Sequence, residues 1–408
     1  MIEILPFLLA ILLGILAGTF TGLAPGIHIN LVAFFLLAIS ASLSSFFPPI
    51  ALAVFIASLS ITHIFIDFIP TIFLGAPDED TSLSILPGHE MLINGQGYEA
   101  VILSVLGALI GIILLIPLIP FFIYLLPIIY PYIQRVIPII LIIIILVMIF
   151  FEKGINKKIL TLIIIILSGF LGFASLNLNL KDPLLPLLTG LFGASSLITS
   201  IAKKQTLPTQ QITNLKTIFK DLKSYSFLKS ISASLIASPI CSFLPSLGSS
   251  QASAIGSYVI GELDRKEFLI LIGIVNTLVM SLSFITLYSI GKSRTGSAVA
   301  INKLISSITQ TDIFLITLAI ILSAIIAFFI SIIIAKYFSK IITRISYTKL
   351  SVFILILLTL ITIIFSNITG LIIFITSTAL GIFTILTGIK RTSLMGCLLI
   401  PTIILYLI

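Results

Sequence analysis

The chain consists of long apolar runs separated by short polar connections. The runs Val136–Phe151, Ile159–Phe173 and Leu350–Phe365 are continuous and rich in Ile and Leu, and they approach or reach the roughly 17–25 residues that cross a hydrocarbon core. In lipid, backbone polar groups must be satisfied within the protein, which leaves helices or a closed barrel. A barrel needs alternating apolar and polar positions, which these runs lack. The pattern predicts an all-α, polytopic protein with about 10–12 transmembrane helices, multi-pass in the cell membrane.

Composition strengthens this interpretation. Hydrophobic residues make up 59% of the chain and charged residues 9%, whereas soluble domains carry about 25% charged residues. The net charge of +8 does not indicate nucleic-acid binding, because the basic residues lie in short clusters between apolar runs, as the positive-inside bias requires. Membrane lipid is therefore the expected surrounding.

One stretch near the middle of the chain, residues 202–229, is too polar to insert. It carries the lysines Lys203, Lys204, Lys216, Lys220, Lys223 and Lys229. We interpret it as a basic cytoplasmic linker between a first transmembrane repeat, residues 1–201, and a second, residues 230–408.

The two sides of the linker resemble each other. Each begins with a break of small residues and proline in apolar sequence, at 22–30 and at 242–251. Further along, Ser168–Gly172 matches Ser377–Gly381 at an offset of 209, and Arg135 with Arg344 and Lys181 with Lys390 fall on the same diagonal. An internal repeat is the expected origin of such matches.

The distribution of charge predicts the orientation of the repeats. The basic loop at 152–158 and the linker mark the inside, and the two spans between them, about 159–178 and 184–201, place Lys181 outside. By the same count, Lys390 lies inside. Matching residues then lie on opposite faces, which is typical of inverted repeats with broken helices or re-entrant hairpins. One miscounted span would remove the inversion.

Paired helix breaks at corresponding positions indicate a transport site near mid-membrane. A half-helix that begins at a break offers free amide donors and the positive end of its dipole, which suits a carboxylate or phosphate. The alternative interpretation is that Pro and Gly only kink two helices. The predicted substrate-binding residues are Pro25, Gly26, His28, Asn30, Pro245, Ser246, Gly248, Ser249, Ser250, Gln251, Lys292 and Arg294.

Two loops of opposite charge follow the breaks. The first carries the consecutive acids Asp78, Glu79 and Asp80, and its counterpart carries Lys292 and Arg294. If the first loop re-enters the membrane, its carboxylates are candidates for a coupling cation, Na⁺ or H⁺. If it lies at the surface, it is a solvated acidic turn. The basic loop would hold the substrate anion, or the acids in the empty state, and Arg294 suits a carboxylate best.

Three further polar residues interrupt apolar spans. His63 and Asp67 are four residues apart and share one helix face. They form either a proton-relay and coupling-ion pair or a helix-end pair at the interface. Asn276 is either an interhelical hydrogen-bonding residue or a site ligand, and the former is the commoner role.

Several motifs, taken in order, resemble the TctA family, the large membrane subunit of tripartite tricarboxylate transporters. They are Gly18-Thr-Phe-Thr-Gly22-Leu-Ala-Pro25-Gly26, the segment Pro87–Ala100, the Gly-Leu-Phe element at Gly190–Phe192, the stretch Pro245–Tyr258 and, less distinctly, Ser393–Pro401. The resemblance covers most of the chain. It implies a permease with two repeated halves and organic anions such as tricarboxylates as substrates.

The resemblance also implies partners, with departures that bear on the substrate. A separate small membrane subunit and an extracytoplasmic binding protein are expected. Ile27–Asn30 replaces the small Gly-containing segment expected after the first Pro-Gly, and Pro245-Ser246 replaces a second Pro-Gly. These changes leave citrate itself open.

Two other functions remain as alternatives to a secondary permease that works by alternating access. An intramembrane enzyme is disfavoured, because His89-Glu90 is not followed by the second His of a His-Glu-x-x-His motif and neither a P-loop nor a Gly-x-Ser-x-Gly elbow is present. A polyprenyl or lipid-phosphate flippase would use the same half-helix ends. No cofactor is expected in any of the transport interpretations.

Overall fold

The computed structural model describes residues 4–24, 29, 47–76, 81–150, 152–178, 180, 183–202, 208–221, 224–243, 248–261, 263–293, 295–305, 307–342 and 347–407. These residues form helices and turns, with no strand among them. The elements of the first half and the linker are α1 (Ile4–Leu23), α3 (Pro49–Leu74), η1 (Ser82–Ser84), α4 (Ile85–Ile93), α5 (Gly97–Tyr124), α6 (Leu126–Phe150), α7 (Ile155–Asn177), α8 (Leu184–Leu188), the π-helix η2 (Thr189–Ala194), α9 (Ser195–Ala202) and α10 (Leu215–Asp221). Those of the second half are α11 (Ser224–Phe243), α12 (Ser249–Ile260), α13 (Arg265–Ile290), α14 (Gly296–Leu304), α15 (Gln310–Ile342), α16 (Tyr347–Thr387), η3 (Arg391–Met395) and α17 (Gly396–Leu407).

Many of these helices are membrane spans. In the described part of the chain, eight are long and apolar enough to cross a membrane, or up to nine if the bent pair Leu126–Tyr132 and Arg135–Phe150 counts as one span. The prediction of an all-α, multi-pass membrane protein is confirmed. The total predicted from the sequence, about 10–12 spans, is larger than this number of spanning helices.

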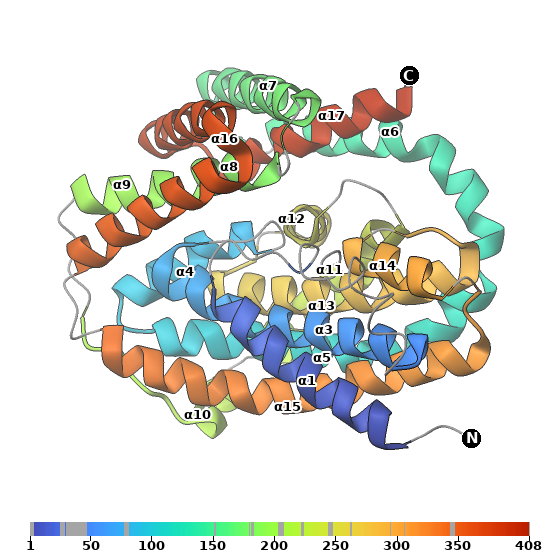
Figure 1. Ribbon diagram of the computed structural model, residues 1–408. Coiled ribbons are helices and arrows are strands. Elements are labelled where there is room, and N and C mark those ends of the chain that lie inside the picture. The colour runs from blue at the N-terminus through green and yellow to red at the C-terminus, as the bar shows by residue number, and fades with distance from the viewer. Residues whose placement is uncertain are drawn as a thin grey trace.

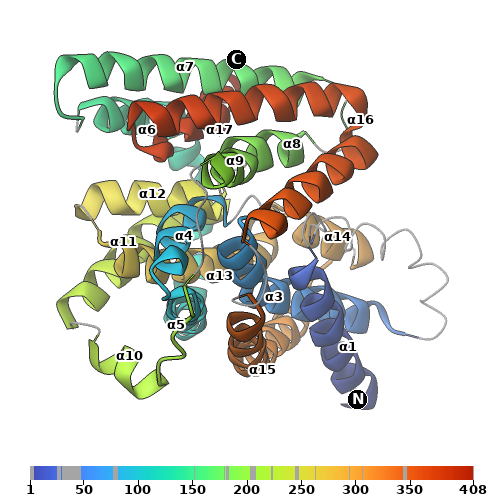
Figure 2. The same ribbon diagram turned by 90° about the vertical axis from the view of Figure 1, so that its left-hand side faces the viewer.

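The helix α16 accounts for part of that difference. It has 41 residues, and its backbone leaves helical geometry at Asn367, with φ 57°. Because one crossing needs only about 20 residues, its two arms are each long enough to cross. Figure 2 shows them meeting at an angle. The break at Asn367 lies 209 positions after Lys158, which belongs to the basic loop predicted at 152–158.

The order of elements in the first half recurs in the second. The helices α3 and α13 each have 26 residues, and both end on a glycine in the left-handed region, Gly75 (φ 65°) and Gly291 (φ 66°). A short helix follows each, α4 and α14, and then a long one, α5 and α15. The two arms of α16 follow in the places of α6 and α7. The inversion of the halves relative to the membrane stays a prediction.

The helices are arranged in two layers (Figure 1, Figure 2). The core layer contains α1, α3, η1, α4, α5 and α11–α15, and the cover layer contains α6–α9, η2, α16, η3 and α17. Each layer includes helices from both halves of the chain. The halves are therefore intertwined and do not form two side-by-side bodies.

In the core layer, helices from different halves cross closely. The helix α5 packs on α13, and α3 packs on α15. A Cβ added at Gly107 of α5 would overlap the carbonyl oxygen of Ile270, and one added at Gly273 of α13 would overlap that of Ser104. Glycine is required here because the two backbones touch.

In the cover layer, two glycines that the 209-residue offset matched also lie where helix backbones touch. A Cβ at Gly172 of α7 would overlap the carbonyl oxygen of Cys397 in α17, and one at Gly381 of α16 would overlap that of Leu191 in η2. Gly172 and Gly381 are 209 positions apart. The matched motifs thus mark equivalent helix crossings, each joining the two halves.

The linker is attached to the core layer. The Gln210 side chain accepts a hydrogen bond from the Gly97 amide (2.8 Å) and donates one to the Leu92 carbonyl (3.0 Å). The Gln211 amide donates to the Gly95 carbonyl at 2.8 Å. The turn between α4 and α5 therefore lies on the same face as the basic linker.

Candidate solute site

The short helix η1 contacts helices of both layers and of both halves of the chain. It contacts α3, α4, α12 and α13 of the core layer and η2 of the cover layer. Its residues Ser82, Leu83 and Ser84 are all buried. A polar segment at the centre of an apolar bundle is costly unless it is hydrogen-bonded or serves a ligand.

A carboxylate lies beside η1, on α3. Asp67 is 7% exposed. One of its oxygens accepts a hydrogen bond from the Thr81 hydroxyl at 2.8 Å, and the other lies 3.5 Å from the Thr71 hydroxyl. The two hydroxyls are 3.0 Å apart. Four oxygen atoms are thus gathered in one buried place. One turn earlier on α3, the His63 Nδ1 lies 3.0 Å from the Thr21 hydroxyl of α1.

The N-terminus of α12 reaches η1 from the second half of the chain. Its N-cap is Gly248, which has no side chain to cap the first amides. The Ser250 hydroxyl accepts a hydrogen bond from the Leu83 amide at 3.3 Å. The first turn of α12 therefore brings the positive end of the helix dipole into direct contact with η1.

Two buried amide side chains in this region lack partners. Gln251, in the first turn of α12, is 2% exposed, and neither its Oε1 nor its Nε2 has a hydrogen-bond partner among the described residues. The same holds for Oδ1 of Asn276 on α13, which is also 2% exposed. Leaving such atoms unsatisfied costs about 1–3 kcal/mol each, so each calls for an explanation. We refer to Asp67, Thr71, Thr81, Ser250 and Gln251 as the η1 cluster.

The second half contains an equivalent arrangement without a charge. The Thr295 hydroxyl at the start of α14 lies 3.0 Å from that of Ser283 on α13, in the position that Thr81 and Asp67 hold in the first half. The Ser297 hydroxyl is 2.8 Å from that of Ser60 on α3. Among the described residues, only the first-half arrangement includes a carboxylate, so the two ends of the repeat differ in chemistry.

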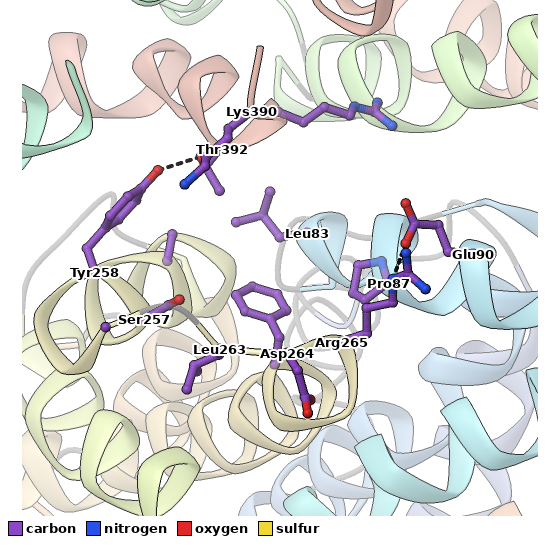
Figure 3. A pocket seen from close by; sticks show the side chains of 14 residues that line it. Leu83, Pro87, Glu90, Ser257, Tyr258, Leu263, Asp264, Arg265, Lys390 and Thr392 are labelled. Atoms are coloured by element: carbon purple, nitrogen blue, oxygen red, sulfur yellow. Dashed lines mark hydrogen bonds and ion pairs between the residues drawn. The ribbon is translucent and has the colours of Figure 1, made fainter. Parts of the chain in front are cut away.

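A pocket of about 430 Å³ lies next to the η1 cluster. Leu83 of η1 lines it, together with residues of α4, α12, the start of α13 and η3. Figure 3 shows Leu83 projecting between these elements, with Glu90 and Arg265 forming an ion pair on one side. On the other side, the Tyr258 hydroxyl of α12 lies 2.9 Å from the Thr392 hydroxyl of η3. The pocket therefore lies between the core layer and the cover layer, and we refer to it as the boundary pocket.

Arg391 stands at the cover-layer side of the boundary pocket. It is 4% exposed, and its guanidinium donates to the carbonyls of Leu191 and Phe192 and to the hydroxyls of Ser195 and Ser196, at 2.5–2.8 Å. A π-helix leaves carbonyls in an irregular position, and Arg391 satisfies two of them. The sequence alone did not indicate this role, because the partners of Arg391 in η2 and α9 lie about 200 positions earlier in the chain.

The predicted site residues fall into three groups. Gly248, Ser249, Ser250, Gln251 and Asp67 come together at η1, although they lie in different halves of the chain. Lys292 is exposed in the turn between α13 and α14. The remaining predicted residues, Pro25, Gly26, His28, Asn30, Asp78, Glu79, Asp80, Pro245, Ser246 and Arg294, lie outside the residues that the structure describes.

The fold and the η1 cluster define the class: a polytopic helical membrane protein with intertwined halves and a buried polar centre. A family model described as "Tripartite tricarboxylate transporter TctA family" matches residues 8–396, and the chain belongs to this family. It is a transporter family, so the chain is a component of a solute-transport system. An uncharacterised protein of Methanocaldococcus jannaschii is 34% identical over 413 aligned positions, which cover 98% of this chain and 99% of that protein. No solved structure matches the chain.

Proposed function

We propose that this chain is the permease that carries a small organic anion, of the di- or tricarboxylate type, across the membrane. The observation that carries the proposal is Gln251, whose side-chain amide is buried without a hydrogen-bond partner among the described residues, at the N-terminus of a helix that touches η1. A carboxylate bound there would accept from Nε2, and a hydroxyl on the same solute would donate to Oε1.

The site favours an anion over a neutral solute. The start of α12 carries a partial positive charge of roughly half an elementary charge, and its N-cap, Gly248, gives no side-chain cap. Asn276 offers a second buried amide group from α13. His28, Asn30 and Arg294 complete the proposed site as predictions from the first break and the basic loop.

Asp67 is the proposed site of the coupling ion. Its carboxylate and the hydroxyls of Thr71 and Thr81 are oxygen ligands of the kind that hard cations prefer, and a protonated carboxyl would donate to the same hydroxyls. A cation or proton at Asp67 would neutralise the charge that otherwise repels an anionic solute nearby. Thr81 directly precedes η1, whose Leu83 bonds to Ser250, so ion and solute would share one short segment.

Alternating access is proposed to come from a movement of the core layer against the cover layer. A rocking of one repeat against the other does not fit the fold, because α5 crosses α13, and α3 crosses α15, between halves. In contrast, the two layers contact each other at η1, around the boundary pocket, along α6 and where the end of α3 meets α16. The small membrane subunit and the extracytoplasmic binding protein stay proposed partners on the basis of the family.

The test is uptake of labelled di- and tricarboxylates into proteoliposomes, with ligand-induced thermal stabilisation as a readout that does not need partner subunits. We expect Gln251→Leu to lower kcat/KM for uptake by roughly 5–100-fold, the cost of one buried hydrogen-bonding group, and to remove the stabilisation. Gln310→Leu, at an exposed position on α15, is the matched control. Asp67→Asn should leave flux insensitive to Na⁺ or to pH.

Two results would contradict the proposal. Unchanged uptake and stabilisation in Gln251→Leu would remove the η1 cluster as the solute site. Scrambling of a polyprenyl phosphate by the wild-type protein, with no response to any organic acid, would favour a flippase.

A further inference from the structure

The boundary pocket has a composition of its own, distinct from that of the η1 cluster. Among the residues on which the proposed transport site rests, none lines it, and Leu83 is its point of contact with η1. Its remaining walls come from α4, α12 and the start of α13 in the core layer and from η3 in the cover layer. A molecule in this pocket would touch both layers at once.

The floor of the pocket is apolar. Leu83, Pro87, Ala254, Leu263 and Phe268 contribute hydrocarbon surface from four separate segments. Ligand pockets of about 300–1,000 Å³ with mainly apolar walls and a few polar groups hold molecules of drug size, and 430 Å³ falls in this range. Such a floor suits the apolar body of a ligand and not a small polyanion, which would leave it unfilled.

The rim carries an excess of positive charge. Three cations, Arg265, Lys390 and Arg391, and two acids, Glu90 and Asp264, line the pocket. Both acids already have partners, since Glu90 pairs with Arg265 and the Asp264 carboxylate accepts from the Glu267 amide at 2.7 Å in the capping box of α13. On the η3 side, the residues that line the pocket include two cations, Lys390 and Arg391, and no acid.

Arg391 adds a second observation. Its terminal nitrogens bind η2, but its Nε is buried and has no hydrogen-bond partner among the described residues. A buried, charged donor without an acceptor is costly. An anionic group in the pocket would supply that acceptor, and the exposed Lys390 is placed at the rim to approach the same group.

We infer that the boundary pocket binds an amphipathic organic anion, with one carboxylate or phosphate head at η3 and an apolar body over the floor between α4 and α12. The head is held by Arg391 and Lys390, and the hydroxyls of Tyr258 and Thr392 offer further polar contacts. Because the ligand contacts both layers, it stabilises their present arrangement. This last consequence rests on the layer movement of the proposed function, whereas the binding does not.

The experiment is photoaffinity labelling in nanodiscs of zwitterionic lipid, with a diazirine-bearing medium-chain fatty acid as the probe and mass spectrometry of the labelled peptides. We expect labels on 254–268 and 390–392. Lys390→Gln should weaken labelling about three- to tenfold through loss of a charge-assisted contact. Ala254→Phe, which fills the floor, should abolish it. Lys336→Gln, at an exposed lysine of α15 outside the pocket, should leave labelling unchanged.

The controls distinguish loss of binding from loss of folding, and a membrane lipid from a soluble ligand. Thermal unfolding checks that each variant is folded, and a probe with an uncharged alcohol head should label the pocket weakly. A diazirine phosphatidylglycerol in place of the free acid shows whether a lipid or a soluble amphipath is the better ligand. Labels spread over the lipid-facing sides of α7 and α16, or equal labelling in all variants, would overturn the inference. Neither result bears on uptake, so the proposed function would stand or fall separately.

Discussion

Asp67 and Gln251 are both buried in an apolar bundle, but their surroundings differ. The Asp67 carboxylate is held by two threonine hydroxyls, whereas no described residue pairs with the Gln251 amide. Both were predicted from the sequence as site residues, because a polar residue in or next to an apolar span is easy to recognise. Thr71 and Thr81 were not, since a threonine in a membrane helix usually bonds to its own backbone and nothing in the sequence shows that it turns to a carboxylate.

A third buried polar residue, His89, gives a prediction on pH. It lies on α4, outside the eight spans, with its Nε2 3.4 Å from the Ser200 hydroxyl of α9. Burial, and secondly the charge of Arg391, lower the pKa of His89 to about 4. The folded protein thus disfavours the proton that the unfolded chain accepts near pH 6.5, so stability is lost as pH falls from about 6.5 towards 4.

We expect lowering the pH from 7 to 5 to cost about 2 kcal/mol of folding free energy through this residue. Thermal unfolding of wild type and His89→Gln across this pH range provides the measurement. The variant should show the flatter slope, and equal slopes in both proteins would contradict the assignment.

At the scale of helices, the close crossings depend on glycine. Gly107 and Gly273 bring α5 and α13 into backbone contact in the core layer, and Gly172 and Gly381 do the same in the cover layer. Sequence comparison found the second pair as a repeat but did not show what each glycine touches. The touching residues, Cys397 and Leu191, lie in the opposite half of the chain, beyond any local pattern.

Gly107→Val should therefore destabilise the protein strongly. The new side chain would meet the Ile270 carbonyl, and a backbone atom cannot rotate away as a side chain can, so we expect a loss of about 3 kcal/mol or more. Ile113→Ala, on the same helix at an exposed position, is the control and should change the melting temperature little. Equal melting temperatures for the two variants would show that the helices separate more easily than their packing indicates.

At the scale of the molecule, the proposed movement is between the two layers and not between the two repeats. The largest helix contacts lie within a layer, often between different halves, while the layers contact each other where η1 meets η2, where α6 meets α5, α12 and α13, and where α3 meets α16. The ion pair between Lys266 and Glu99 (2.5 Å) further joins α13 to α5 within the core layer. Two rigid layers with a polar centre between them are the arrangement that alternating access requires.

Cross-linking tests this division. In a chain whose native cysteines have been replaced, Tyr258→Cys with Thr392→Cys, joined by a short bifunctional thiol reagent, should stop flux, because it ties the two layers across the pocket. Ser60→Cys with Ser297→Cys, whose hydroxyls are 2.8 Å apart within the core layer, should keep flux when oxidised to a disulfide. Flux that survives the first cross-link would rule out movement between the layers.

The sequence by itself determined that this is a helical membrane protein, and it predicted that the halves repeat and that polar residues in and beside the spans form the site. These features follow from local composition, because a chain in lipid must bury its backbone polar groups and cannot hide ionisable ones. The tertiary structure decided that the halves intertwine into two layers, that α12 contacts η1, and that Arg391 donates hydrogen bonds to a π-helix. Such pairings join residues 167 to 237 positions apart, and close packing of whole helices selects them.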